Sequence, residues 1–325
     1  MALKLYNESD IQDIADSIRA KNGTQNTYKV SQMADAIDEI PSGGGDVDKF
    51  FTQYNQLVDL SEYSLGPVTD LREYSFYMFA KLTGITFPSG LTSIGKYAFY
   101  GCSELILSSL PESVVSIGNN AFEGCSKLAL TSLPSGLTSI SDGIFQSCVR
   151  LALSSLPEGV TSIGRNSFQY CAGISGLTSL PSSVTSIGAN AFSRSGIVSM
   201  SIPEGVTSIK NDTFYYCKLL TSVSLPSGLT SIEVEAFAYS DKIPLIDIPS
   251  AIQSIGGAAF LYCSLLKTVI CRAISPPSLG GNAFAITHSE LKIYVPDDSV
   301  EDYKGATNWS VYADKIYPLS QYNPS

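Results

Sequence analysis

The sequence predicts a β-rich right-handed solenoid with a 23-residue period, in which short strands and one tight helical turn per repeat stack into a rod. Three recurring positions carry this prediction. A proline recurs at intervals of 22 to 24 residues, an isoleucine follows six residues later, and a phenylalanine follows five residues after that. We call each copy of the pattern a rung. The ten phenylalanines are Phe76, Phe99, Phe122, Phe145, Phe168, Phe192, Phe214, Phe237, Phe260 and Phe284.

The rung around Phe99 shows how each element is predicted. The residue before Pro88 is extended, as pre-proline residues prefer, and the proline ends a strand. Residues 91–94 predict a short strand, Gly95 a turn, and residues 96–101 one tight helical turn. Leu105 then begins the next strand. In the following rung seven positions are expected to be buried: Leu110, Val114, Ile117, Ala121, Phe122, Cys125 and Leu128.

Single rungs are not expected to fold alone. One rung buries too few apolar side chains to offset the conformational entropy lost on ordering about 23 residues. Stacking adds packing and ladder hydrogen bonds between neighbours, which is how solenoids are stabilised. We therefore assign residues 65–295 to one continuous solenoid.

Both ends of such a stack need covering, because open strand edges promote aggregation. Residues 46–64 are the expected N-terminal cap, with Phe50, Phe51, Tyr54, Leu57 and Leu60 as its apolar cover. Residues 296–325 are the expected C-terminal cap. There Asp297, Asp298 or Ser299 is expected to cap a short helix that carries Val300 and Tyr303 on one face. The aromatic and apolar residues expected to cover the last rung are Trp309, Tyr312 and Ile316.

Residues 1–45 are expected to form a separate helical segment. Apolar residues recur there at helical spacing, as in Ile11, Ile14 and Ile18, and a glycine-rich joint follows at residues 42–45. This segment is interpreted either as an attachment module or as a helical hairpin that caps the solenoid.

The repeated pattern LPxxVTSIGxxAFxxCxxL resembles the BspA-type leucine-rich repeat, known from bacterial surface proteins. The resemblance spans about residues 65–295, and the C-terminal segment resembles the closing unit of such proteins. It implies a leucine-rich repeat solenoid whose role is adhesion or recognition without catalysis. The phrase DIADSIRAKNG…YKVSQMADAIDEI resembles a module in tail and structural proteins of phages that infect Firmicutes, which would attach the rod to a virion.

Composition excludes several functional classes. The net charge of −10 argues against nucleic-acid binding and against a basic membrane anchor. No stretch is long and apolar enough to predict membrane insertion, and no secretory signal is visible. His288 is the only histidine, no CxxC pair is present, and we expect no catalysis, metal or cofactor. Acidic residues of the repeats (Glu104, Glu112, Asp142, Glu158) are expected in unrelated positions.

Two further columns are interpreted as structural. Six of the seven cysteines stand three residues after a phenylalanine, but Phe79, Ser195 and Ser240 fill the same position elsewhere. We therefore expect buried free thiols rather than disulfides. A serine before each isoleucine is expected to bond the backbone of neighbouring rungs.

The candidate binding site is a column two residues after phenylalanine on five consecutive rungs, which we call the tyrosine column. Its members are Tyr170, Arg194, Tyr216, Tyr239 and Tyr262. The adjoining position adds Tyr77, Tyr100 and Tyr215. Tyr and Arg are typical of recognition surfaces. Two interpretations stay open: the column binds a ligand, or its rings pack together and shield the core.

The sequence thus predicts a non-enzymatic recognition or adhesion protein, exposed outside a cell or on a virion, that binds a host protein or a surface glycan. Phage tail components are the partners expected for residues 1–45. The alternative is a purely structural spacer in a tail or surface assembly. A cytoplasmic location stays open.

Overall fold

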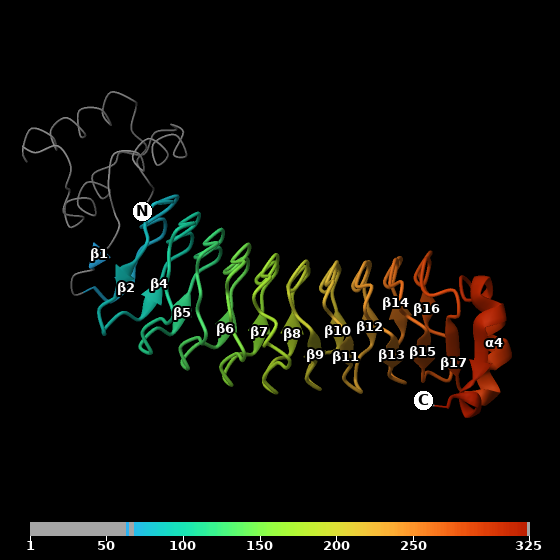
Figure 1. The fold of residues 1–325 in the computed structure, drawn as a ribbon. Coiled ribbons are helices and arrows are strands. Elements are labelled where there is room, and N and C mark those ends of the chain that lie inside the picture. Colours follow the sequence, from blue (N-terminus) through green and yellow to red (C-terminus); the bar gives the residue numbers. More distant parts are fainter. Residues whose placement is uncertain (1–62, 65–67, 324–325) are drawn as a thin grey trace, which may run out of the picture.

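The structure is a computed structural model that describes residues 63–64 and 68–323. These residues form one elongated rod of stacked rungs, closed at its C-terminal end by a short helical cap (Figure 1). The solenoid prediction is confirmed. The expected segment 1–45 and the five apolar residues of the expected N-terminal cap lie outside the described residues.

The first strand column is built from two-residue parallel strands, one per rung. Within three sheets of three, three and four strands, neighbouring strands pair in register, as in Ser93↔Ser116 and Ile94↔Ile117. The isoleucines point into the core and are buried. The strands are β2 (Asp70–Leu71), β4 (Ser93–Ile94), β5 (Ser116–Ile117), β6 (Ser139–Ile140), β7 (Ser162–Ile163), β8 (Ser186–Ile187), β10 (Ser208–Ile209), β12 (Ser231–Ile232), β14 (Ser254–Ile255) and β16 (Ser278–Leu279).

The second strand column is discontinuous. It comprises β1 (Tyr63–Ser64), β3 (Ile85–Thr86), β9 (Ser199–Ser201), β11 (Ser222–Ser224), β13 (Leu245–Ile248), β15 (Thr268–Cys271), β17 (Lys292–Val295) and β18 (Ile316–Pro318). The strand expected from Leu105 does not form. Buried Leu107 and Leu110 are three residues apart, which a strand with alternating side chains cannot place on one face. In β11 and the residue after it, Val223 and Leu225 are two residues apart and both pack against the core.

The segment between the two strand columns is a pair of tight turns rather than the expected helical turn. Alternate N–H groups bond within the turn and to the next rung: Tyr100 N donates to Tyr97 O (3.2 Å) and Phe99 N donates to Ala121 O (2.7 Å). The residues two before and two after each of the ten phenylalanines have positive φ. A helical turn has neither bonds to the next rung nor residues with positive φ. The tight turns have both, and their bonds connect consecutive rungs along this edge of the rod.

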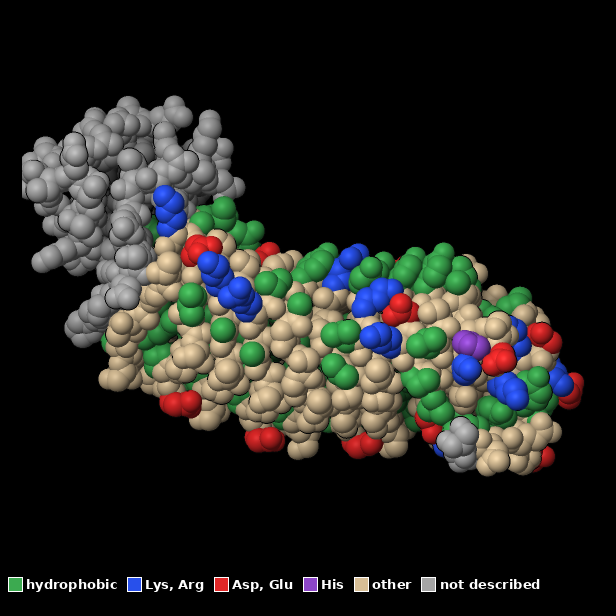
Figure 2. All heavy atoms as spheres, in the orientation of Figure 1, with side chains coloured by type: hydrophobic (Ala, Val, Ile, Leu, Met, Phe, Trp, Pro, Cys, Tyr) green, Lys and Arg blue, Asp and Glu red, His purple; other side chains and the backbone are tan. Residues whose placement is uncertain are grey.

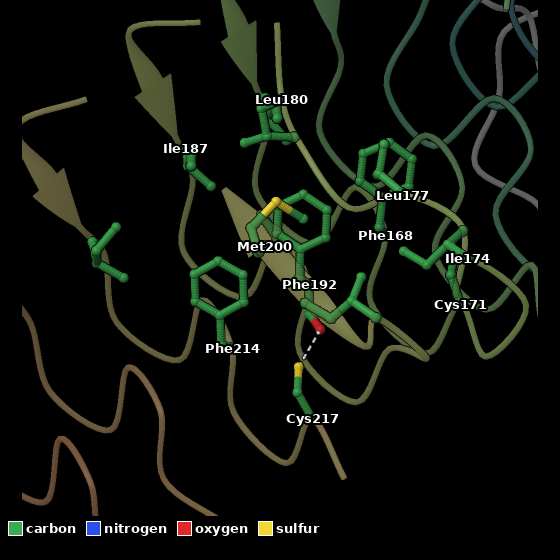
Figure 3. Packing of buried hydrophobic residues seen from close by; sticks show 14 of the residues in the cluster. Phe168, Cys171, Ile174, Leu177, Leu180, Ile187, Phe192, Met200, Phe214 and Cys217 are labelled. Carbon is green, nitrogen blue, oxygen red and sulfur yellow. Dashed lines mark hydrogen bonds between the residues drawn. The ribbon is translucent and has the colours of Figure 1, made fainter. Parts of the chain in front are cut away.

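The core is a continuous stack of the ten phenylalanine rings. Neighbouring ring centroids lie 5.1 to 5.9 Å apart. Figure 3 shows Phe168, Phe192 and Phe214 in this row, with Ile187 and Met200 beside them. The seven positions predicted to be buried in the rung of Phe122 are all buried. Sequence spacing therefore placed the core correctly.

The cysteines are free and buried, as predicted. Cys217 Sγ lies 3.1 Å from the carbonyl oxygen of Phe192, the dashed line in Figure 3, and Cys125 Sγ lies 3.0 Å from that of Phe99. Ser240 Oγ makes the same bond to Phe214 O at 2.7 Å, which explains why serine replaces cysteine without loss of the contact.

The hydroxyl ladder differs from the prediction. The threonine one residue before the serine, and not the serine itself, bonds the backbone across rungs: Thr161 Oγ1 donates to Thr138 O (3.2 Å) and Thr230 Oγ1 to Thr207 O (2.9 Å). Serines of the column face outward. Ser93, Ser208 and Ser231 bond side chains, and among the described serines of the column Ser278 alone donates to backbone across rungs, at Gln253 O (3.3 Å). Strand alternation explains the difference, because the buried isoleucine forces its neighbouring serine outward.

The C-terminal cap covers the last rung as expected. It contains η1 (Asp297–Ser299), α4 (Val300–Gly305), η2 (Ser310–Lys315) and η3 (Leu319–Gln321). Trp309 is fully buried 5.9 Å from the Phe284 ring, and its Nε1 donates to Pro277 O at 2.8 Å. No side chain caps the helix; Asp297 Oδ1 instead accepts a bond from Ser320 N at 2.9 Å.

Candidate functional site

The tyrosine column lies on the edge of the rod formed by the tight turns. Each member stands on a turn that is bonded to the next: Tyr170 N donates to Ser193 O and Arg194 N donates to Tyr215 O. The structure thus brings the five predicted residues into one line, with Tyr215 beside it. Figure 2 shows hydrophobic side chains gathered along the upper edge of the rod, above the region of β10, β12 and β14 in Figure 1.

Arg194 occupies the centre of an aromatic cluster. Its guanidinium carbon lies 4.8 Å from the Tyr216 ring centroid and 5.5 Å from those of Tyr170 and Tyr215. Contacts of this kind hold a cation over aromatic faces. Lys218 Nζ lies 4.5 Å from the Tyr216 ring centroid. The same atom forms an ion pair with Asp241 Oδ2 at 3.1 Å.

The C-terminal part of the column is a stack of rings. Tyr239 and Tyr262 lie 4.6 Å apart with an interplanar angle of 14°, and Tyr216 is tilted against Tyr239 at 6.2 Å. Each ring therefore covers a face of its neighbour. The column presents ring edges and hydroxyl groups to solvent.

The column is nevertheless exposed. The exposed fractions are 42% for Tyr170, 38% for Tyr216 and 40% for Tyr262, while Tyr239 is intermediate. Within the described part of the chain, the hydroxyls of these four tyrosines have no hydrogen-bond partner. The rings are packed and the polar tips are free, so the two interpretations of the column are compatible at the level of geometry.

Every member of the column has left-handed backbone. The φ values range from 56° at Tyr216 to 61° at Tyr239. This conformation costs a non-glycine residue roughly 1–2 kcal/mol. Gly101 and Gly124 hold the same position in two earlier rungs, where the cost is absent. Five later rungs carry Tyr or Arg at a position that the backbone itself favours for glycine.

The predicted set divides into two clusters. Tyr77 and Tyr100 stack at 5.0 Å in a separate N-terminal cluster with Tyr74 and Tyr97, which stack at 5.1 Å. Rungs carrying Gly124 and Ser147 separate that cluster from Tyr170. Tyr100 therefore belongs to the N-terminal cluster and not to the tyrosine column.

Sequence reasoning missed Tyr74 and Tyr97, which stand two residues before phenylalanine in the first two rungs. It also missed Ile286, which continues the tyrosine column on the next rung with φ 53° and 56% exposure. The repeat register could have identified Ile286, because it stands two residues after Phe284, the same position that the column residues hold in their rungs.

Acidic residues near the column are partly buried. Burial raises the pKa of Asp212, and Glu235 on the next rung adds to the effect. Burial also raises the pKa of Tyr215, which the charge of Arg194 partly offsets. The charges of Asp212 and Glu235 also act on Tyr215, and neither carboxylate forms an ion pair with Arg194.

One group of acidic residues corrects the sequence analysis. Glu112, Glu158 and Glu204 share one position, directly after the proline, on alternate rungs. Two of them bind the backbone N and Oγ of the next rung's serine, Glu204 with Ser227 at 2.9 and 2.7 Å. Figure 2 shows separate acidic side chains along the lower edge.

Other chemistry is limited in the region described. His288 Nδ1 accepts a bond from Glu290 N at 3.1 Å. Residues 68–323 contain no group of three or more histidine, cysteine, aspartate or glutamate side chains placed to hold a metal ion. Among the described helices none has the length and hydrophobicity of a membrane span.

Comparison with known proteins gives a family match. The model of the BspA type leucine-rich repeat region matches in six copies across residues 52–175 and 176–291. No curated protein matches the chain.

Several solved structures are similar. A leucine-rich cell surface protein of Faecalibacterium prausnitzii A2-165 is 24% identical over 75% of this chain and 79% of that chain, with a TM-score of 0.41. The leucine-rich repeat protein of T. pallidum is 25% identical over 56% and 78%, with a TM-score of 0.39. The pneumococcal vaccine antigen PcpA is 19% identical over 80% and 78%, with a TM-score of 0.49.

Proposed function

We propose, from the premise that this chain belongs to the BspA-type leucine-rich repeat family, that it is a non-enzymatic recognition protein. The tyrosine column is the proposed binding surface, and a host protein or a surface glycan is the proposed ligand. The protein acts outside a cell or on a virion, where such a ligand is accessible. Attachment of the rod to phage tail components through residues 1–45 remains a prediction that falls on residues outside the described ones.

One observation carries the proposal. On five consecutive rungs the column places large side chains on one edge of the rod, and Tyr170, Tyr216 and Tyr262 are about two-fifths exposed with free hydroxyls. Exposed aromatic side chains gathered on one surface are typical of interaction sites. A surface of Tyr and Arg also has the composition of binding hot spots.

A second candidate function is the structural spacer. The close stack of Tyr239 on Tyr262 at 4.6 Å supports it, because ring packing of this kind contributes about 0.5–1.5 kcal/mol per pair to stability. In this alternative the column shields the core edge and has no ligand.

Removing only the hydroxyls separates the two functions. Tyr216→Phe and Tyr262→Phe keep the rings, so the melting temperature of the double variant should match that of the parent. Each lost hydroxyl contact should weaken binding by about 0.5–1.5 kcal/mol. Binding is measured on a printed panel of oligosaccharides and purified extracellular proteins, with the full chain as the soluble partner.

Ile274→Ser is the matched control, because Ile274 is 77% exposed and lies outside the column. It should change neither binding nor the melting temperature. Undiminished binding by the double phenylalanine variant, or no binding by the parent, would favour the spacer.

A further inference from the structure

We infer that the tyrosine column takes a polypeptide segment carrying an Asp or Glu carboxylate flanked by apolar side chains, and that Arg194 anchors the carboxylate. The inference rests on the proposed function and narrows its ligand from "protein or glycan" to one class. Four features of the column carry it.

The first feature is an unpaired guanidinium. Arg194 is exposed and, within residues 68–323, makes no ion pair with any carboxylate and no side-chain hydrogen bond. The ring centroids of Tyr170, Tyr215 and Tyr216 lie within 5.5 Å of its guanidinium carbon. A guanidinium among aromatic rings keeps its N–H donors free for an anion. Carboxylate and phosphate both match its fork geometry, and the charge of the chain, discussed below, favours the singly charged carboxylate.

The second feature is the orientation of the rings. Sugar rings bind tyrosine by stacking on its face, but one face of Tyr239 and one face of Tyr262 cover each other. Arg194 lies over the Tyr170 ring. Ring edges carry partial positive charge and hydroxyls donate and accept hydrogen bonds, which suits carbonyl and carboxylate oxygens of a polypeptide.

The third feature is exposed aliphatic surface along the same rungs. Ile286, next to Tyr262 in the column, is 56% exposed. Leu219 and Leu265 each stand three residues after a column tyrosine and are 43% and 49% exposed. Aliphatic side chains gain free energy from burial against apolar groups, which a polypeptide supplies and a sugar chain largely lacks.

The fourth feature is the charge of the whole chain. A net charge of −10 repels a dense polyanion such as a sulfated glycan. Screening confines that repulsion to about 8 Å at physiological salt, so a single carboxylate docked on Arg194 is little affected. The preferred ligand therefore carries one local negative charge inside an apolar sequence.

The test uses two probes with the full chain. One probe is a yeast-displayed library of random linear peptides, and the other is an immobilised panel of neutral, sialylated and sulfated oligosaccharides. Selected peptides should be enriched in Asp or Glu next to Leu, Ile or Phe. Arg194→Gln should weaken their binding about 10- to 100-fold, and Arg194→Lys should restore part of it.

Arg150→Gln is the matched control, because Arg150 is exposed but stands outside the column; it should leave peptide binding unchanged. Selected peptides without acidic residues, or equal binding by Arg194→Gln, would overturn the inference. Binding of oligosaccharides alone, weakened by Tyr216→Phe, would overturn it while the proposed function stands. Absence of any binding that column variants weaken would count against both.

Discussion

Replacing one phenylalanine of the core stack by leucine tests whether the rungs are coupled only to their neighbours. Phe192 is fully buried, and its ring stacks on Phe168 at 5.4 Å and on Phe214 at 5.6 Å. Phe192→Leu keeps a large apolar side chain but removes two ring pairs. At about 0.5–1.5 kcal/mol per pair, the free energy of unfolding should fall by about 1–3 kcal/mol.

The coupling is measured with double-mutant cycles. Phe192→Leu and Phe214→Leu both remove the same ring pair, so the double variant should lose about 0.5–1.5 kcal/mol less than the sum of the single losses. Phe260 lies three rungs from Phe192 and shares no ring contact with it. Phe192→Leu with Phe260→Leu should therefore be additive within about 0.5 kcal/mol.

Equilibrium urea unfolding provides the assay, followed by far-ultraviolet circular dichroism and by fluorescence of Trp309. Trp309 lies in the C-terminal cap 4.9 Å from the Tyr303 ring, so its fluorescence reports that end, whereas circular dichroism reports the whole rod. Coincident transitions would justify treating unfolding as one step. Zero coupling between neighbouring phenylalanines, or equal coupling in the distant pair, would refute the nearest-neighbour reasoning.

Two further predictions concern stability. A Cβ at Gly196 would lie 1.9 Å from Ala172 O, whereas a Cβ at Gly228 would meet nothing within 4 Å. Gly196→Ala should therefore lower the free energy of unfolding by about 1–3 kcal/mol, and the control Gly228→Ala should change it by less than about 1 kcal/mol. Equal melting temperatures of the two variants would contradict this prediction. Burial raises the pKa of all seven cysteine thiols, to about 12 for Cys217 and Cys263. Because unfolded thiols ionise near pH 9 while folded ones stay neutral, their contribution is complete below pH 9 and falls above it, by about 1.4 kcal/mol per pH unit per thiol. Urea midpoints measured on both sides of pH 9 check this, and an unchanged slope in Cys217→Ala would contradict it.

The repeat spacing predicted the features that arise from packing of one rung against the next. Proline, isoleucine and phenylalanine at fixed intervals located the first strand column and the core stack. Position also predicted that cysteine would be a buried hydrophobe, because a disulfide framework would not tolerate Ser240 in the series. Trp309 was placed over the last rung because an open stack needs a cover.

Backbone conformation within the turns was not predicted. The sequence pattern favoured one helical turn in each rung. Alternate backbone N–H groups of this segment instead donate to carbonyl groups of the next rung. The sequence of a single rung does not show these bonds, because they form only between rungs. Glycine at 101 and 124 and asparagine at 120 and 166 are the residues that tolerate positive φ, so the signal was present in the sequence. The second strand column does not form in rungs where buried leucines such as Leu107 and Leu110 lie three residues apart. Side chains of a strand alternate between its two faces, so this spacing cannot place both leucines on the core face.

Footprinting of a bound complex shows whether the tyrosine column is the binding surface. Hydroxyl-radical labelling of the tyrosines is compared with and without a saturating ligand, taken from either probe set. We expect protection at Tyr170, Tyr216 and Tyr262, which are about two-fifths exposed in the free rod, and unchanged labelling at Tyr317 in the C-terminal cap. Protection confined to other faces, with the tyrosine column labelled as before, would contradict it.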